Sequence, residues 1–341
     1  MRRFNLKGKV VQRMMGIEDD RESKGKKSPA GKEQEQESAA ASPADEKTFA
    51  PEGTRLAWRT DTGRIRRNNQ DAVILGYGLI GVADGMGGHN GGEIASAGLR
   101  DGLLRELKDK QPDLDVLAEA VRKINLELWQ QQEQDAALTG MGTTLTILWP
   151  AETEMIIGQV GDSRAYLIRN GGMTQVTNDH SMVADMVRKG VLTEEQAACH
   201  PMRNYITRAV GTEDTIEVDM QTVPRATGDR WLVCSDGLYG QISKSELQEL
   251  MSITDLEEAA DRLLQAALEN GGKDNISFVL LQDDKENEAP AAETAEDAGA
   301  ENEPDGGQPE AGNENAEETE KDQAEDSQED PQHSPGEGAV Q

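Results

Sequence analysis

Single aspartates recur at the ends of apolar runs in this sequence. Asp84 and Asp236 each follow such a run and precede a glycine, Asp71 and Asp274 each stand just before one, and Asp162 follows another. A carboxylate at the end of a strand is held by a rigid element and still reaches the open edge of a sheet. If those edges converge, the carboxylates would repel one another strongly unless cations neutralised them.

Such a cluster would bind hard divalent ions. Oxygen-only ligand sets select magnesium or manganese over zinc, and two such ions about 4 Å apart can hold a hydroxide and clamp a phosphoryl group for in-line attack. An Asp-Gly pair after a strand is also an ordinary turn signal. The spacing alone therefore leaves open whether the five aspartates converge.

The two cysteines offer no alternative metal chemistry. Cys199 and Cys234 lie far apart and lack CxxC spacing, which excludes a disulfide framework and a structural zinc site. Cys234 lies in an apolar run and is expected to be a small core residue. So few cysteines are typical of the reducing cytoplasm, where we expect the protein to reside.

The elements that would hold the aspartates are short strands and a few amphipathic helices. Residues 113–133 have apolar side chains at helical spacing, Ser243 with Glu246 resembles a capping box, and Asn170-Gly171 predicts a hairpin turn. Hairpins and short turns favour mainly antiparallel sheets covered by helices. The strand-like runs are Ala72–Leu75, Leu79–Ala83, Thr144–Trp149, Met155–Val160, Ala165–Ile168, Ile216–Val223, Trp231–Cys234 and Ile276–Leu281, and a further helix is expected over 255–270.

Charge divides the chain into three parts. The 341 residues carry a formal charge of −30, of which 283–341 contributes −19 and 51–281 contributes −13, whereas 1–50 is slightly basic at +2. Both ends lack apolar periodicity and cannot bury enough apolar surface to offset the entropy of ordering. We therefore expect a disordered segment 1–50, one folded domain 51–282 and an acidic disordered tail 283–341.

The composition also argues against two kinds of partner. The acidic balance argues against nucleic acid, whose affinity rests on Lys and Arg meeting phosphates, and 3% aromatic residues leave few side chains for stacking on bases. No apolar run approaches the roughly 20 residues that span a membrane, and the basic start lacks the apolar core of a secretory signal. We expect no nucleic-acid partner and no stable membrane insertion.

Eight short motifs resemble, in order and spacing, those of the bacterial PP2C-type (PPM family) metal-dependent Ser/Thr protein phosphatases. Any one of them is a weak signal, because Asp-Gly pairs are common, but the ordered set is specific. The motifs fall between about Arg55 and Leu281 and are Arg66–Asp71, Val82–His89, Gly142–Thr144, Gly161–Leu167, Asp179–Ser181, Thr207–Gly211, Cys234–Leu238 and Lys273–Ser277.

The resemblance implies a fold and a cofactor. The fold is α+β, a four-layer αββα sandwich of two mainly antiparallel sheets flanked by helices, with the metal centre at one edge. The cofactor is two core ions, Mn²⁺ or Mg²⁺, with a possible third and weaker one. The segment Ser181–Tyr205 corresponds to the flap beside the site.

The resemblance also implies roles for single residues. Asp84 would bridge both core ions, and the carbonyl of Gly85 would complete one site. Asp236 and Asp274 would bind one ion, and Asp71 would act through metal-bound water. The other two assignments are a third ion held by Asp162 with Asp236, and substrate phosphate bound by Arg66, whose planar fork suits phosphate oxygens.

Two residues depart from the family pattern. Gln70 stands where many members have glutamate, so the site carries one charge less and its metal affinity is expected to be lower. Met86 stands where animal and plant members have the histidine proposed as general acid. Methionine cannot donate a proton, so another group must do so; His89 is near in sequence, but a packing or capping role is equally compatible with it.

Several neighbouring residues are expected to be structural. His180 is expected to make a structural hydrogen bond, and Arg164 and Arg208 to pair with carboxylates lining the cluster rather than to bind substrate. The pair Gly91-Gly92 is expected to allow close packing rather than to bind an anion.

The resemblance implies hydrolysis of phosphoserine and phosphothreonine in proteins by a metal-activated water, without a phosphoenzyme. A phosphodiesterase or nucleotide hydrolase using the same metals is a rival, and a catalytically inactive PP2C-fold binding module is the alternative. Retention of the acidic ligands together with Arg66 argues against the inactive module. The expected partners are phosphorylated proteins, including the substrates of a cognate Ser/Thr kinase, and the protein is expected to be a monomer.

Overall fold

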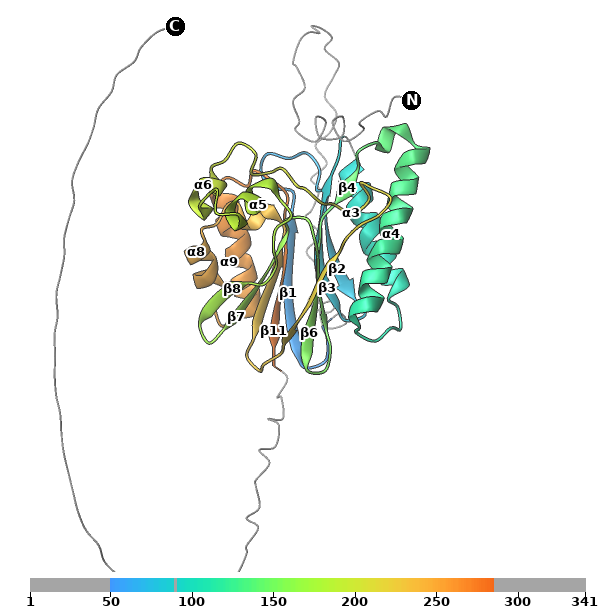
Figure 1. Ribbon diagram of the computed structural model, residues 1–341. Helices are drawn as coiled ribbons and strands as arrows, with labels where there is room; N and C mark the ends of the chain where they lie inside the picture. Colours follow the sequence, from blue (N-terminus) through green and yellow to red (C-terminus); the bar gives the residue numbers. More distant parts are fainter. Residues whose placement is uncertain (1–49, 89–90, 285–341) are drawn as a thin grey trace, which may run out of the picture. The chain divides into compact units, whose positions relative to one another are not determined.

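The computed structural model of the protein describes residues 50–88 and 91–284, and two antiparallel sheets lie at its centre (Figure 1). The first sheet has the strand order β1-β11-β10-β7-β8. Every neighbouring pair in it is antiparallel. Its strands are β1 (Thr54–Asp61), β11 (Ile276–Asp283), β10 (Arg230–Cys234), β7 (Arg164–Arg169) and β8 (Gly172–Gln175).

The second sheet has the order β2-β3-β5-β6-β9, with the short β4 paired to β3. Its pairs are antiparallel as well. Its strands are β2 (Asp71–Gly76), β3 (Leu79–Met86), β4 (Gly142–Thr143), β5 (Leu145–Pro150), β6 (Glu154–Val160) and β9 (Asp219–Pro224).

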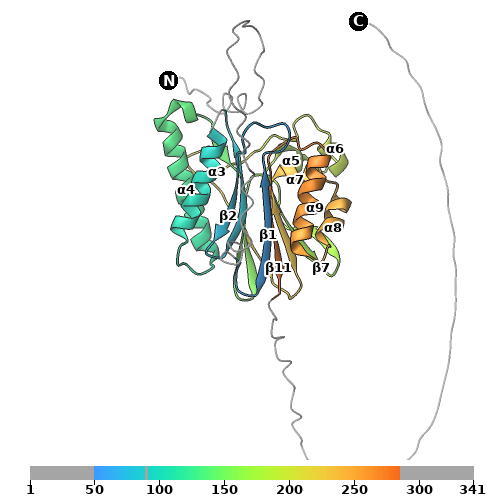
Figure 2. The same ribbon diagram turned by 180° about the vertical axis from the view of Figure 1, so that it is seen from behind.

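Helices cover the outer face of each sheet (Figures 1 and 2). Helices α3 (Gly91–Glu106) and α4 (Leu114–Gln134) pack on the second sheet, and α8 (Lys244–Met251) and α9 (Leu256–Glu269) pack on the first. The shorter elements are α7 (Asp236–Tyr239), the 3₁₀ turn η1 (Ala136–Leu138), and α5 (Met182–Arg188) and α6 (Glu194–Ala198), which lie in the predicted flap segment. The predicted four-layer αββα sandwich is confirmed.

The alternation of side chains along β10 explains the layering. Successive residues of a strand point to opposite faces, so Trp231 and Val233 pack between the two sheets, whereas Leu232 and Cys234 pack against α8 and α9. All four are buried. The strand is thus apolar on both faces, which is why it reads as a continuous apolar run, and the prediction that Cys234 is a core residue is confirmed.

Local sequence signals account for the element boundaries. The predicted hairpin joins β7 to β8 through Asn170 and Gly171, both at positive φ. Ser243 caps α8 by accepting a hydrogen bond from the amide of Glu246 at 3.2 Å, and Asp113 caps α4 in the same way. Each cap satisfies an amide that has no partner within its helix.

Strand β1 was absent from the predicted set. Its sequence contains three charged residues and only Leu56 and Ala57 are buried, so it lacks the apolar run that marks the predicted strands. It forms because its backbone pairs along its whole length with β11, from Thr54 opposite Asp283 to Asp61 opposite Ile276. This long-range pairing has no local signal.

The predicted termini lie almost entirely outside the described residues. The last strand runs to Asp283, one residue beyond the predicted domain end, and the Asp283 carboxylate pairs with Arg225 at 2.6 Å, both side chains being buried. Within 50–88 and 91–284 no helix is both long and apolar enough to cross a membrane.

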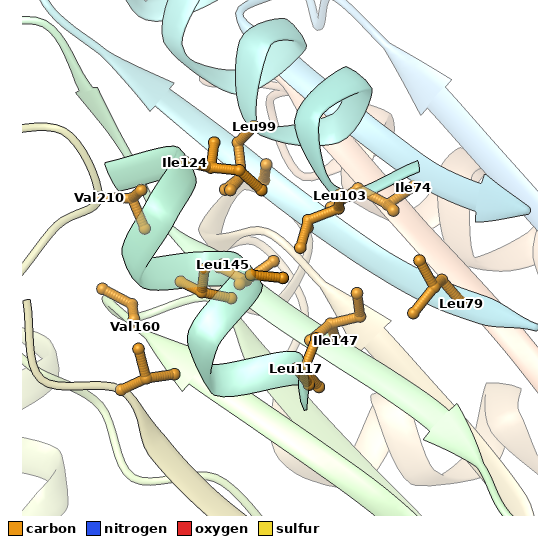
Figure 3. Packing of buried hydrophobic residues seen from close by; sticks show 14 of the residues in the cluster. Ile74, Leu79, Leu99, Leu103, Leu117, Ile124, Leu145, Ile147, Val160 and Val210 are labelled. Atoms are coloured by element: carbon orange, nitrogen blue, oxygen red, sulfur yellow. The ribbon is translucent and has the colours of Figure 1, made fainter. Parts of the chain in front are cut away.

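The apolar layer between α3, α4 and the second sheet supports the strands that carry two of the aspartates (Figure 3). Leu103 of α3 is fully buried there. Replacing Leu103 by Ala should lower the free energy of unfolding by about 2–5 kcal/mol, because the lost methyl groups leave a cavity. Urea denaturation would measure it, with Leu126→Ala as control, since Leu126 on α4 is 40% exposed. Equal losses for both variants would contradict the assignment of this core.

Candidate metal centre

The register of the second sheet brings the first two aspartates together. Asp71 opens β2 and is the direct cross-strand partner of Asp84 in β3. The backbone of Asp84 is fixed from the other side, because its amide donates to Thr144 Oγ1 at 2.9 Å and its carbonyl accepts from the Thr144 amide at 2.9 Å. Two carboxylates on adjacent strands therefore face one edge of the sandwich.

The other three come from turns at the same edge. Asp236 is the first residue of α7, directly after β10, Asp274 precedes β11, and Asp162 follows β6. The carboxyl group of Asp84 interacts electrostatically with Asp71, Asp162, Asp236 and Asp274. The structure thus brings together all five aspartates that the sequence singled out.

Two polar side chains of the first sheet tie the second sheet to it at this edge. The Ser235 hydroxyl donates to Asp71 Oδ2 at 2.8 Å. The Asn275 side chain accepts from the Gln70 amide at 2.9 Å, and it donates to the carbonyls of Thr62 and Asn68 at 3.0 and 2.9 Å. These hydrogen bonds link the two carboxylate-bearing edges and orient the groups that lie on them.

Close backbone packing also shapes the edge. A Cβ on Gly237 would lie 1.9 Å from the Asn275 carbonyl oxygen, and one on Gly85 would lie 2.1 Å from that of Gly92. Both positions therefore require glycine. The prediction that Gly91-Gly92 serves close packing agrees with this contact. Gly85 itself directly follows Asp84 near the end of β3.

Burial and mutual repulsion disfavour the charged forms of these carboxyl groups. Burial, followed by the charges of Asp236 and Asp274, raises the pKa of Asp71 to about 7. Burial and then Asp274 raise the pKa of Asp236 to about 6. The pKa values of Asp84 and Asp162 are also raised well above the ordinary range, again chiefly by burial and neighbouring aspartates.

Two oxygens of the cluster are buried without a hydrogen-bond partner, Oδ1 of Asp71 and Oδ1 of Asp236. A buried carboxylate oxygen without a donor is costly, and a hard divalent cation would satisfy both oxygens while neutralising the repulsion. The donor set therefore fits magnesium or manganese.

The side chains are not already arranged as a complete cage. Among the residues of 50–88 and 91–284, no group of three or more His, Cys, Asp or Glu is positioned as it stands to hold a metal ion. Asp71 Oδ2 accepts from Ser235, and Asp274 Oδ2 accepts from Arg66 Nη2 at 2.7 Å. An ion bound by Asp274 would thus either share this carboxylate with Arg66 or displace the guanidinium.

Arg66 is a cationic group that contacts the cluster directly through Asp274. Its side chain is 46% exposed while it pairs with Asp274, so the guanidinium reaches both the carboxylates and the solvent. Such a fork can bind two phosphate oxygens.

A further group behind Asp162 was not foreseen from the sequence. The Tyr239 hydroxyl donates to the backbone carbonyl of Asp162 at 2.9 Å. The guanidinium of Arg164 lies over the Tyr239 ring, 3.7 Å from its centroid, and pairs with Asp179 at 2.7 Å. Tyr239 is the last residue of the short helix α7, which begins at Asp236, and this helical turn brings its side chain to Asp162. No pattern in the sequence predicts this contact.

The structural roles of the neighbouring side chains are partly as predicted. His180 is buried, and its Nδ1 accepts from the Gly161 amide at 3.1 Å, which confirms a structural hydrogen bond. Arg164 and Arg208 both pair with carboxylates. The partner of Arg164, Asp179, interacts electrostatically with Asp162 of the cluster, as expected, whereas the partners of Arg208 lie elsewhere. Arg208 pairs with Asp219, the first residue of β9, and with Glu217, which precedes that strand. His89 lies outside the described residues.

An αββα sandwich with interacting carboxylates at one edge is the architecture of the PP2C-like phosphatases. The Protein phosphatase 2C family matches residues 63–280, and the chain belongs to that family. Among its relatives is the serine/threonine protein phosphatase PstP of Mycobacterium tuberculosis, 42% identical over 229 residues, which cover 66% of this chain and 44% of PstP. The chain therefore matches less than half the length of PstP.

Two further comparisons cover nearly the whole of the other protein. The serine/threonine phosphatase stp of Listeria monocytogenes is 37% identical over 243 residues, 67% of this chain and 95% of stp. The solved catalytic domain of PstP in complex with two manganese ions superimposes with a TM-score of 0.63 at 38% identity, covering 67% of this chain and 97% of that domain.

The raised pKa values predict how pH acts on the metal-free protein. An aspartate in an unfolded chain ionises near pH 3.9, so between about pH 4 and 7 the unfolded state loses protons that Asp71 and Asp236 retain when folded. Stability should therefore fall as pH rises through this window. We expect the melting temperature in excess chelator to decrease from pH 5 to pH 8, less steeply in Asp71→Asn. Added Mn²⁺ should raise it more at pH 8 than at pH 5.

The control for this measurement is Asp115→Asn, which removes an exposed carboxylate in the first turn of α4. It should leave the pH dependence of the wild type unchanged. The same slope for Asp71→Asn and the wild type would show that Asp71 does not titrate in this window.

Proposed function

We propose that the protein is a metal-dependent phosphatase that hydrolyses phosphoserine and phosphothreonine in other proteins. One observation carries this proposal: five aspartates from both sheets interact at one edge, with the partly exposed Arg66 beside them. The family of the chain supports the same activity, since its relatives include named serine/threonine phosphatases.

The proposed ligands are those of the carboxylate edge. Asp84 with the carbonyl of Gly85, Asp236 and Asp274 would hold two core ions, with Asp71 supporting them. Asp162, together with Asp236, would hold a third and weaker ion. When bound there, Mn²⁺ or Mg²⁺ would supply Lewis-acid chemistry, activating water near neutral pH and neutralising phosphoryl charge. The two manganese ions of the PstP catalytic domain support a site with two core ions.

The remaining roles fall to the side chains of the chain itself. Arg66, once released from Asp274, would bind the phosphoryl oxygens and stabilise the charge that develops on them. Asp71 would keep its position through the hydrogen bond from Ser235. Met86, paired with Gly142 at the end of β3, carries no proton, so the leaving alkoxide must be protonated by another group.

A cysteine phosphoenzyme is disfavoured by the placement of the thiols. Cys234 is fully buried in the core, and burial raises the pKa of its thiol far above the ordinary value. Cys199 caps the short helix α6 and is exposed. Neither thiol lies in a loop that cradles phosphate, which is consistent with direct attack by water.

The finer parts of the proposal concern partners and setting. A phosphatase of this kind acts after a Ser/Thr kinase, so we propose a cognate kinase and its substrates as the source of phosphorylated proteins. Two free cysteines without a disulfide are compatible with the proposed cytoplasmic location. We also propose that the protein acts as a monomer, because its carboxylate edge is built from one chain.

Phosphate release from a phosphothreonine peptide by the full-length protein would test this function. We expect turnover with Mn²⁺, none in excess chelator, and a loss of at least about 100-fold in Asp236→Asn. Removing a residue that only hydrogen-bonds to a metal ligand costs about 10- to 100-fold in activity. Because Asp236 is proposed as a direct ligand, its loss should cost at least the upper value.

The control is Asp115→Asn, with folding of each variant verified by its melting temperature. Full activity of Asp236→Asn would contradict the proposed metal centre. Absence of turnover by the folded wild type on peptides and on a small aryl phosphate would instead favour the inactive binding module.

A further inference from the structure

The connection between β1 and β2, residues 62–70, forms one rim of the carboxylate edge, and we call residues 63–68 the rim loop. It crosses the end of the sandwich at which α5 and α6 also lie (Figures 1 and 2). Residues 64–68 are all exposed. Ile65 is 68% exposed, more than any other exposed large hydrophobic side chain of the described residues.

The exposure of Ile65 does not come from a loose loop. The amide of Arg64 donates to the Gly272 carbonyl at 2.7 Å, and its guanidinium donates to the Leu268 carbonyl at 2.9 Å. The Asn275 side chain also donates to the carbonyls of Thr62, which precedes the loop, and of Asn68, its last residue. The loop is thus held at both of its ends.

Close contact with the turn before β11 restricts the loop further. Gly63 has a φ of +75°, and a Cβ there would lie 2.2 Å from the Asp274 carbonyl oxygen. The backbone of the loop therefore packs directly on the turn that carries Asp274. Ordering an exposed loop is entropically unfavourable, and here it presents Ile65 and Arg67 at a fixed place.

The rim loop is also a local reversal of charge. Residues 51–281 carry a net charge of −13, yet Arg64, Arg66 and Arg67 lie together, with Lys273 on the adjoining turn. Arg64 and Arg66 have partners, as described above. Arg67 is exposed and makes no hydrogen bond or ion pair to any residue within the described ranges. Its guanidinium is available to an incoming anion.

We propose that the rim loop binds the segment flanking the phosphorylated residue. It would select phosphoproteins that carry an acidic residue and an aliphatic residue beside the phosphoserine or phosphothreonine. This inference rests on the proposed phosphatase function. Arg66 pairs with Asp274 at the reaction site, so its chain neighbours Ile65 and Arg67 lie where the flank of a bound phosphopeptide would pass.

Arg67 and Ile65 each specify one residue type in the bound segment. The Arg67 fork suits a carboxylate, and covering Ile65 removes apolar surface from water. The acidic tail of this chain matches only the first requirement. Residues 285–341 contain a single large apolar residue, Val340. A separate phosphoprotein segment is therefore the better occupant.

The test compares phosphothreonine peptides of one length that differ only in their flanks. The reference has an acidic residue and a leucine beside the phosphothreonine; one variant replaces the acidic residue by lysine and another replaces the leucine by alanine. For the full-length wild type with Mn²⁺ we expect kcat/KM to be about fivefold higher for the acidic than for the lysine peptide, the upper end for one exposed ion pair. This preference should fade at 1 M salt, whereas the leucine preference should persist.

The enzyme variants assign each preference to one side chain. Arg67→Ala should abolish the preference for the acidic flank, and Ile65→Ser should abolish that for leucine. Both should leave hydrolysis of a small aryl phosphate, which has no flank, at the wild-type rate. The matched controls are Arg122→Ala and Leu126→Ser on α4, an exposed cation and an exposed aliphatic residue on the outer layer; both should retain the two preferences.

The outcomes separate this inference from the function on which it rests. Unchanged preferences in Arg67→Ala and Ile65→Ser, with normal aryl phosphate turnover, would overturn the rim-loop proposal alone. A gain in aryl phosphate turnover in Arg67→Ala would also overturn it, since it would mean that the acidic tail of the chain covers the loop. No turnover of any substrate by the folded wild type would refute the phosphatase function itself.

Discussion

Electrostatic repulsion among buried carboxylates is the constraint on which the rest of this structure depends. Asp71, Asp84, Asp162 and Asp236 share one edge, and burial together with their mutual charge raises the pKa of each. Without a cation, the fold has to hold these carboxyl groups together against their mutual repulsion. An edge of this kind is unfavourable unless it binds a divalent ion, which is why its existence argues for chemistry rather than for stability.

The two sheets supply the rigidity that this constraint demands. Their inner faces pack through a buried apolar layer that includes Trp231, Val233 and Ile157, which holds the two sheets together. At the edge itself, hydrogen bonds join the sheets. Ser235 donates to Asp71, and Asn275 bonds to the backbone at both ends of the β1–β2 connection. Hydrophobic packing therefore fixes the distance between the sheets, and directed hydrogen bonds fix the orientation of the carboxylates.

The same fastening has a second consequence beside the site. Because Asn275 and the turn before β11 hold the rim loop, the backbone that carries its arginines and Ile65 is fixed beside the turn that contains Asp274. A mobile loop would have to be ordered by each substrate at an entropic cost, whereas a preordered one can discriminate between flanks. Asn275 and the turn before β11 would thus position both the reacting groups and the loop proposed to select substrates.

Local sequence determined a good part of this protein. Apolar runs located eight of the strands, cap residues such as Asp113 and Ser243 located helix starts, and strand-end aspartates located the candidate site, because each of these signals acts within a few residues. Other features depend on partners far away in the chain. Strand β1 exists through pairing with β11, Arg66 reaches Asp274 across 208 residues, and Tyr239 meets Asp162 only because α7 turns it back. Whether the five aspartates converge was likewise open in the sequence, since spacing carries no distance between separate strands; the packing of one sheet on the other decided it.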